Sequence, residues 1–190
     1  MNLDGLKVAV LVTDGYEPSE LTEPVAALRD AGATTTIVSN HEGTITGKTD
    51  ADTAQVDLTL DQADPGEFDA LLIPGGVKNP DTMRQEPRAV DFVRAMFDAK
   101  KPMASICHGP WMLIEADVVR GRRVTSYPSL KTDLRNAGAE WTDEEVVVDQ
   151  GLVTSRTPKD LPAFNAKMVE EFGEGTHDRR STAAEPVSAG

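Results

Sequence analysis

The sequence predicts an α/β fold in which helices cover both faces of a mostly parallel central sheet. Short runs of apolar, β-branched residues alternate with amphipathic segments along the chain. The first of these runs, residues 6–13, is almost wholly apolar, which is typical of parallel strands that are buried on both faces. A chain of 190 residues is also long enough for one domain with a substantial core.

The N-terminal half contains three predicted strands and two predicted helices. The strands are residues 6–13 (LKVAVLVT), 33–39 (ATTTIVS) and 68–76 (FDALLIPGG). Residues 17–32 have apolar positions spaced by three and four, with Pro18 at the start and Gly32 as the C-terminal stop, and therefore predict a helix. Residues 86–101 predict a second amphipathic helix.

The C-terminal half continues the alternation. We expect a strand at residues 102–107, helices at 109–118 and 129–138, two strands within 144–158 and a closing helix at 160–172. The two strands are joined by a turn at Gln150 and Gly151. Residues 174–190 are small and polar, so we expect a single domain over residues 1–173 followed by a flexible tail.

Composition excludes several classes of protein. A formal charge of −13 disfavours a nucleic-acid surface and binding to anionic membranes, because both need basic patches. The single cysteine cannot form an internal disulfide, and the first residues lack the basic and apolar regions of a signal peptide. No apolar run approaches the about 20 residues of a membrane span. We therefore expect a soluble cytoplasmic protein.

The only cysteine lies in the stretch KPMASICHGPWML, at the end of a predicted strand and before a predicted helix. Ligands of such sheets bind beyond the carboxyl ends of the strands. A sharp strand-to-helix turn pushes its central residue into that crevice and needs small neighbours, which Ser105 and Gly109 provide. The pattern predicts that Cys107 is a nucleophile whose pKa is lowered by the helix N-terminus. The alternative is a small, buried apolar residue.

Histidine and acidic residues near this turn are candidates to assist Cys107. His108 is the best-placed histidine, because His41 lies in a loop and His177 in the predicted tail; its alternative is a structural role. Glu17 and Glu20 begin the first helix at the same edge of the sheet. Either they complement the helix dipole, or one carboxyl is pressed against the thiol, keeps its proton and donates a hydrogen bond to the thiolate.

Two further features follow the third predicted strand. Gly75 and Gly76 allow backbone N–H groups to approach a substrate oxygen, so that together with the N–H of His108 they predict an oxyanion hole; a simple turn is the alternative. Asp81 lies in a predicted loop and, taken alone, is a helix cap or a solvated charge.

Several segments together resemble the ThiJ/PfpI family of the class I glutamine-amidotransferase-like superfamily. They are AVLVTDGYEPSEL, LLIPGG with PDTMR, ASICHGPWMLI, RGRRVTSYPSLKTDLRNAGAEW and VVVDQGLVTSRTPKDLPAF, which occur in the family's order over residues 6–172. The resemblance implies a flavodoxin-like three-layer sandwich, a cysteine at a nucleophile elbow, and assembly into homodimers or larger homo-oligomers.

The resemblance also implies roles for individual residues. Cys107 is the nucleophile, His108 its neighbouring base, and Glu20 the acid that hydrogen-bonds the cysteine, with Glu17 close by. Asp81 matches a glutamate that, in archaeal members, completes a triad in the site of the adjacent subunit. Tyr127 matches a tyrosine that lines the pocket.

The family includes glutathione-independent glyoxalases, protein deglycases and intracellular peptidases, all of which begin with thiolate attack on a carbonyl. The shorter side chain of Asp81 weakens a peptidase triad. We therefore expect a stress-protective enzyme that acts on reactive carbonyls or on glycated proteins. An intracellular cysteine peptidase acting on unfolded protein is the first alternative. A redox sensor or chaperone in which Cys107 is oxidised to a sulfinate is the second.

Other classes of enzyme fit less well. A glutamine amidotransferase needs a late histidine–glutamate pair, and no such motif is seen in the sequence. One cysteine with scattered histidines is a poor metal-ligand set, so we expect neither a metal nor another cofactor.

Overall fold

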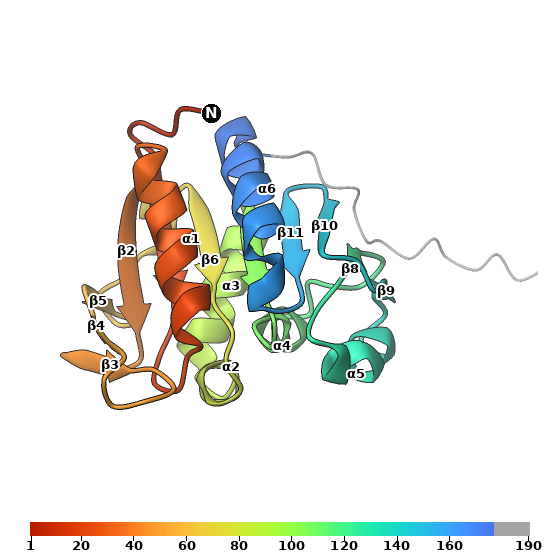
Figure 1. Cartoon of the computed structure of the whole chain (residues 1–190), viewed down its shortest axis with the longest axis horizontal. Helices are drawn as coiled ribbons and strands as arrows, with labels where there is room; N and C mark the ends of the chain where they lie inside the picture. Colours follow the sequence, from red (N-terminus) through yellow and green to blue (C-terminus); the bar gives the residue numbers. More distant parts are fainter. Residues whose placement is uncertain (177–190) are drawn as a thin grey trace, which may run out of the picture.

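The computed structural model describes residues 1–176 and confirms the predicted α/β class. Its central sheet has the strand order β10-β11-β7-β6-β1-β2-β5 (Figure 1). The bounds are β1 Lys7–Leu11, β2 Thr34–Ser39, β5 Leu58–Thr59, β6 Ala70–Ile73, β7 Met103–Ile106, β10 Val146–Asp149 and β11 Leu152–Ser155. Only the β10–β11 pair in this sheet is antiparallel, so the sheet is mostly parallel, as expected.

Helices cover both faces of this sheet. Helices α1 (Pro18–Asp30) and α6 (Leu161–Glu174) pack side by side on one face, which is the near face in Figure 1. Helices α3 (Pro87–Asp98) and α4 (Pro110–Glu115) pack on the other face, and α5 (Lys131–Asn136) extends that layer. The result is the three-layer sandwich that the resemblance implied.

Strand β1 shows why its sequence is an unbroken apolar run. Val8 and Val10 belong to the core under α1 and α6, whereas Ala9 and Leu11 belong to the core under α3 and α4. All four are buried, because successive side chains of a strand point to opposite faces. Burial on both sides requires apolar residues at every position of the strand.

Several short elements were not predicted. A hairpin of β3 (Thr44–Thr46) and β4 (Thr53–Gln55), and the parallel pair β8 (Arg123–Val124) and β9 (Glu140–Trp141), lie outside the main sheet. The segment around Asp81, which we expected to be a loop, is helix α2 (Lys78–Met83). These elements have two to six residues, too few to show a hydrophobic period in the sequence.

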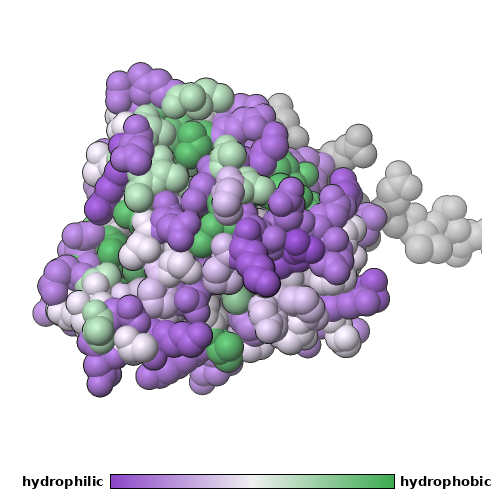
Figure 2. Space-filling view, in the orientation of Figure 1, coloured by the Kyte–Doolittle hydropathy of each residue, from purple (hydrophilic) through white to green (hydrophobic). Residues whose placement is uncertain are grey.

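The end of the domain and the absence of a membrane span were also predicted from the sequence. Helix α6 continues to Glu174, one residue beyond the predicted end of the domain, and residues 177–190 of the predicted tail, with His177, lie outside the described residues. Within residues 1–176, no helix is both long and apolar enough to cross a bilayer. The face shown in Figure 2 is mainly hydrophilic, with small, separate hydrophobic areas.

Strands β7, β6 and β1 are neighbours and run parallel, so their carboxyl ends meet at one edge of the sheet. Cys107 follows β7, the Gly75-Gly76 pair follows β6 by one residue, and the loop that leads to Glu17 and Glu20 follows β1. The topology therefore brings three separate segments of the sequence to one place.

Candidate active site

Cys107 occupies the sharp turn between β7 and α4, as the sequence predicted. Its φ of 63° lies in the left-handed region, which is uncommon for a residue with a side chain. Backbone hydrogen bonds hold the turn on both sides: the Cys107 N–H donates to the Ser155 carbonyl at 3.0 Å, and the Tyr127 N–H donates to the Cys107 carbonyl at 2.9 Å. The conformation is thus imposed by neighbouring strands and loops.

Small residues beneath the turn make this conformation possible. A Cβ on Gly109 would lie 2.6 Å from Ser105 Oγ and 2.8 Å from the carbonyl oxygen of Ile73, which is closer than a Cβ approaches non-bonded atoms in proteins. Ser105 itself is completely buried under the turn. The expected need for small neighbours at these two positions is therefore met.

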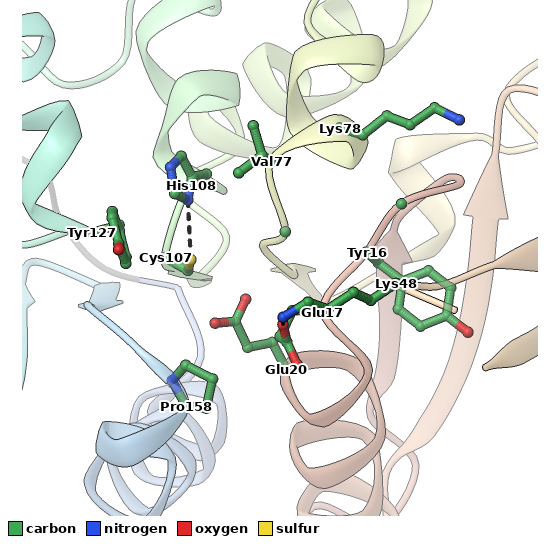
Figure 3. Close-up of a pocket in the computed structure, with 12 residues that line it drawn as sticks. Tyr16, Glu17, Glu20, Lys48, Val77, Lys78, Cys107, His108, Tyr127 and Pro158 are labelled. Atoms are coloured by element: carbon green, nitrogen blue, oxygen red, sulfur yellow. Dashed lines mark hydrogen bonds and ion pairs between the residues drawn. The ribbon is translucent and has the colours of Figure 1, made fainter. Parts of the chain in front are cut away.

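The Cys107 sulfur faces His108 and Glu20 from two sides (Figure 3). Sγ lies 3.1 Å from Nδ1 of His108, although the two residues are adjacent in the chain. On a regular strand their side chains would point to opposite faces, so this contact depends on the turn. Cys107 as a whole is 7% exposed and lines the pocket, so the residue is buried but in contact with the cavity.

His108 is held from three sides. The Tyr127 ring stacks on it with ring centres 4.6 Å apart, and Trp111 meets it edge-on at 5.2 Å. Its Nε2 lies 3.2 Å from Oγ of Ser129, which follows Tyr127 by two residues. Burial lowers the pKa of His108, so the imidazole is neutral at neutral pH.

Glu20 projects from the first turn of α1 toward the sulfur and is completely buried (Figure 3). Neither carboxyl oxygen has a partner with hydrogen-bond geometry, although the Cys107 thiol and the backbone N–H groups of Gly75 and Gly76 are near enough to lower its pKa. Desolvation outweighs them and raises the pKa of Glu20 to about 7. A proton on Glu20 near neutrality agrees with the sequence prediction, and its orientation disfavours the helix-capping alternative.

The predicted lowering of the thiol pKa is wrong, because desolvation of the buried sulfur is the largest effect on it. Burial and the charge of Glu20 raise the pKa of Cys107, and the backbone N–H groups of Gly76 and His108 lower it by less. Because Cys107 and Glu20 are in contact, they titrate as a pair, and the first proton leaves that pair near pH 7.

The glycine pair after β6 forms the wall opposite His108. A Cβ on Gly75 would collide with Glu20 and would lie 2.6 Å from Cys107 Cβ, and a Cβ on Gly76 would lie 2.8 Å from the Glu17 nitrogen. Asn79, which the sequence did not single out, secures this loop: its amide nitrogen donates to the carbonyls of Pro74 and Gly75, and its oxygen accepts from the Thr13 N–H at 2.8 Å.

These groups line a cavity of about 400 Å³, a size suited to a small molecule or to one side chain of a larger one. Two lysines in its lining were not predicted, Lys48 from the β3–β4 hairpin loop and Lys78 from the start of α2. The Lys48 ammonium lies 3.6 Å from a carboxylate oxygen of Glu17, so the two charges offset each other at the mouth.

Two residues that the sequence analysis considered, Asp81 and His41, lie outside the cavity. Asp81 is exposed on α2 and is not part of the cavity lining, so a single chain does not bring it to His108. His41 pairs with Asp14 at 3.0 Å, outside the cavity, as expected of a poor candidate. Within residues 1–176 no three His, Cys, Asp or Glu side chains are grouped as metal ligands.

Comparisons with known proteins show which proteins this chain is similar to. The model of the DJ-1/PfpI family matches residues 6–171. The chain is 47% identical over 169 residues to protein/nucleic acid deglycase 2 of Escherichia coli, which covers 88% of this chain and 98% of the relative. It is 46% identical over 160 residues to YraA of Bacillus subtilis, whose name proposes a cysteine protease, with 84% and 94% covered.

A solved structure from Anabaena variabilis, a two-domain protein with a dj-1/thij/pfpi-like and a ferritin-like domain, superimposes with a TM-score of 0.85. The identity is 37%, and the match covers 95% of this chain. The chain spans about half of that protein, 52% of its length.

The titration of the Cys107–Glu20 pair predicts how the thiol reacts with iodoacetamide. The labelling rate of the lone cysteine should rise through about pH 7, because Glu20 then becomes able to accept the thiol proton. Glu20→Gln should move the midpoint upward by at least about one pH unit, since the buried thiol loses that acceptor.

Glu17→Gln is the matched control for this titration. The charge of Glu17 raises the pKa of Glu20, so its removal should move the labelling midpoint slightly downward, in the opposite direction. If the pH midpoint of labelling were unchanged in Glu20→Gln, Glu20 would not accept the thiol proton, and its role would be to stabilise the N-terminus of α1.

Burial of Glu20 also predicts a pH dependence of stability. Its pKa rises from 4.5 to about 7 on folding, so the folded state holds the proton more tightly, and this stabilisation is lost as the pH rises from about 4.5 to about 7. At about pH 8, Glu20→Gln should therefore be more stable than the wild type by up to about 3 kcal/mol, and the difference should shrink below about pH 5. Urea unfolding at both pH values measures it; a difference independent of pH would contradict the raised pKa.

Proposed function

The chain belongs to the DJ-1/PfpI family, and on that premise we propose that it is a cysteine-dependent hydrolase of reactive carbonyl compounds or of their adducts with amines. The observation that carries the proposal is the buried contact between Cys107 and Glu20 in a cavity sized for a small molecule. A carboxyl group that titrates near pH 7 is matched to accept and return a proton at neutral pH.

The reaction begins with attack of the Cys107 sulfur on the aldehyde carbon of a dicarbonyl such as methylglyoxal. The thiol proton passes to the Glu20 carboxylate, a C–S bond forms, and the carbonyl oxygen becomes an alkoxide. The backbone N–H groups of Gly76 and His108, which already act on the sulfur, are the donors proposed to stabilise that oxygen. The alkoxide then takes a proton to give a hemithioacetal.

The second half of the reaction moves a proton and adds water. A base, Glu20 or His108, removes the proton from the former aldehyde carbon, and the neighbouring ketone oxygen takes a proton, which gives an enediol. A proton then adds to the neighbouring carbon while the hydroxyl of the first carbon loses its proton to the base, so that a thioester of a hydroxy acid forms. Water then attacks the thioester, breaks the C–S bond and restores the thiol. The sum is addition of one water to the dicarbonyl, with no external oxidant or reductant.

In a hemiaminal adduct of the dicarbonyl with an amine, the sulfur forms its C–S bond at the carbon that carries the nitrogen. The C–N bond breaks, the amine leaves with the proton that Glu20 took from the thiol, and the same hemithioacetal results. The name of the Escherichia coli relative extends to nucleic acids. This chain carries a formal charge of −13, which repels nucleic-acid backbones. We therefore restrict the proposal to free carbonyls and to adducts on small molecules and proteins, with Tyr127 and Glu17 lining the substrate pocket.

Peptide hydrolysis is the second candidate, favoured by the likeness to YraA. It needs a histidine that becomes a cation and protonates the leaving amine, usually with an acid to orient it. Burial lowers the pKa of His108, and within the described residues 1–176 no charged group raises it in return. The geometry of the single chain therefore favours carbonyl chemistry.

Asp81 can contribute to an active site only if two copies of the chain associate. The carboxylate is exposed on α2 and away from its own cavity, a location that suits contact with a second copy of the chain. We propose a homodimer or larger homo-oligomer in which Asp81 lies near the site of the neighbour.

Cys107→Ala should lower turnover of methylglyoxal by at least about 1,000-fold without unfolding the protein, because the nucleophile is lost. The same preparation is assayed on a glycated amino acid and on an unfolded protein, with Cys107→Ser as the size-matched variant. Retained activity in both variants would remove Cys107 from the mechanism and point to a contaminant.

The pattern across substrates separates the candidates. Cysteine-dependent turnover of methylglyoxal or the glycated amino acid supports the proposal, and turnover of unfolded protein alone supports the peptidase. Absence of all turnover, with a stable gain of two oxygens on Cys107 after mild peroxide in mass spectrometry, would replace both by the redox sensor.

Mixing variant subunits tests the role of Asp81. If Asp81 acts on the neighbouring site, mixtures of Cys107→Ala and Asp81→Asn subunits should form mixed oligomers with more activity than the two separate preparations predict. Additive activity after subunit exchange, verified by native mass spectrometry, would contradict a role between subunits.

A further inference from the structure

We propose that Ser129 is the positioning residue for His108, and that its hydroxyl takes the place that an acid holds in a cysteine–histidine–acid triad. The inference rests on the proposed function, because it specifies how His108 serves the sulfur. Ser129 belongs to the short 3-10 helix Pro128–Leu130, and neither the sequence nor the likeness to known proteins singled it out.

The position of the His108 ring is fixed by its neighbours, so the remaining question is which of its two nitrogens carries the hydrogen. Nδ1 is 3.1 Å from the Cys107 sulfur, and Nε2 is 3.2 Å from Ser129 Oγ, so both ring nitrogens are engaged. Tyr127 lies almost parallel to the ring, with 25° between the planes, and prevents it from tilting away. The chemical nature of the partner at Nε2 therefore determines which tautomers the ring can adopt in this position.

A hydroxyl group serves both tautomers, whereas a carboxylate serves one. When Nδ1 accepts from the thiol, the Nε2–H donates to Ser129 Oγ. When the Nδ1–H donates to the thiolate, the Ser129 O–H donates to Nε2. A carboxylate can only accept, so it would hold the hydrogen on Nε2 and stabilise the charged ring.

The charges around His108 agree with this assignment. Within residues 1–176, the hydrogen-bond partners of the two ring nitrogens are the Cys107 sulfur and the Ser129 hydroxyl, and neither is a carboxylate. Asp133 of α5 accepts instead from the Trp111 indole N–H at 3.2 Å. Glu20 lies on the other side of the sulfur. Thus His108 remains neutral, which suits proton movement in carbonyl chemistry and disfavours the thiolate–imidazolium pair of peptidases.

The direct test is nitrogen NMR of the full-length protein with ¹⁵N-labelled histidine. His108 is assigned by the loss of its signals in His108→Gln. At about pH 7.5 the wild type should show a neutral ring, and Ser129→Ala should change the ratio of the two neutral tautomers. Ser129→Thr keeps the hydroxyl and should retain the wild-type spectrum, as should Thr132→Ala, which removes a hydroxyl from the neighbouring helix α5.

A second test of the proposal places a carboxylate next to the His108 ring. Ser129 and Thr132 are both exposed, so an aspartate at either site avoids burial of the charge in the core. Ser129→Asp should raise the pKa of His108 by about one unit or more, whereas Thr132→Asp should shift it by less, because only the first variant places a carboxylate at Nε2. Ser129→Ala should also lower kcat on methylglyoxal about tenfold with little change in KM.

The proposal is overturned if Ser129→Ala leaves the ring spectrum unchanged, or if the wild type shows a charged ring at about pH 7.5. It is also overturned if Asp81→Asn, and not Ser129→Ala, alters the tautomers, since an acid from a second copy would then hold Nε2. These NMR results do not depend on turnover. Failure of the carbonyl assay with the expected tautomer change would reject the proposed function and leave the role of Ser129 at the ring intact.

Discussion

The buried contact between the Cys107 sulfur and the Glu20 carboxyl is the interaction on which the rest of this site depends. Each group alone would resist ionisation in this environment, and each charge opposes the other. The pair therefore loses one proton near neutral pH and keeps the second. A sulfur that can hand its proton to a neighbour at the moment of attack does not need a low pKa of its own.

The fold imposes this contact by local constraints that have few alternatives. The left-handed turn at Cys107 directs the sulfur toward α1, and Gly109 allows the turn to sit on β6 and β7. Gly75 leaves room for the carboxyl between two backbones, and Asn79 ties that loop to the end of β1. Parallel strands with their carboxyl ends at one edge make these segments neighbours, so the sheet topology and the site are parts of one arrangement.

The parts that could be predicted from the sequence are those that leave a local pattern. Short runs of apolar and β-branched residues predicted the buried strands, and a cysteine between Ser105 and Gly109 predicted the elbow. The contact of Ser129 with His108 could not be predicted, because it joins residues 21 positions apart through a short 3-10 helix with no periodicity. Helix α2 and the two lysines of the cavity, Lys48 and Lys78, were not predicted either, because they too lie in short segments without a periodic pattern. The direction of the thiol pKa was wrong because desolvation depends on packing around the sulfur, which residue types alone do not report.

The central claim is that Cys107 and Glu20 share one proton above neutrality, and neutron diffraction from crystals exchanged into heavy water at about pH 8 would observe that proton directly. The account predicts one deuteron on the pair, on either the sulfur or a Glu20 oxygen, and two deuterons in crystals at about pH 5. Two deuterons at the higher pH, or a Glu20 carboxyl turned away from the sulfur, would contradict it.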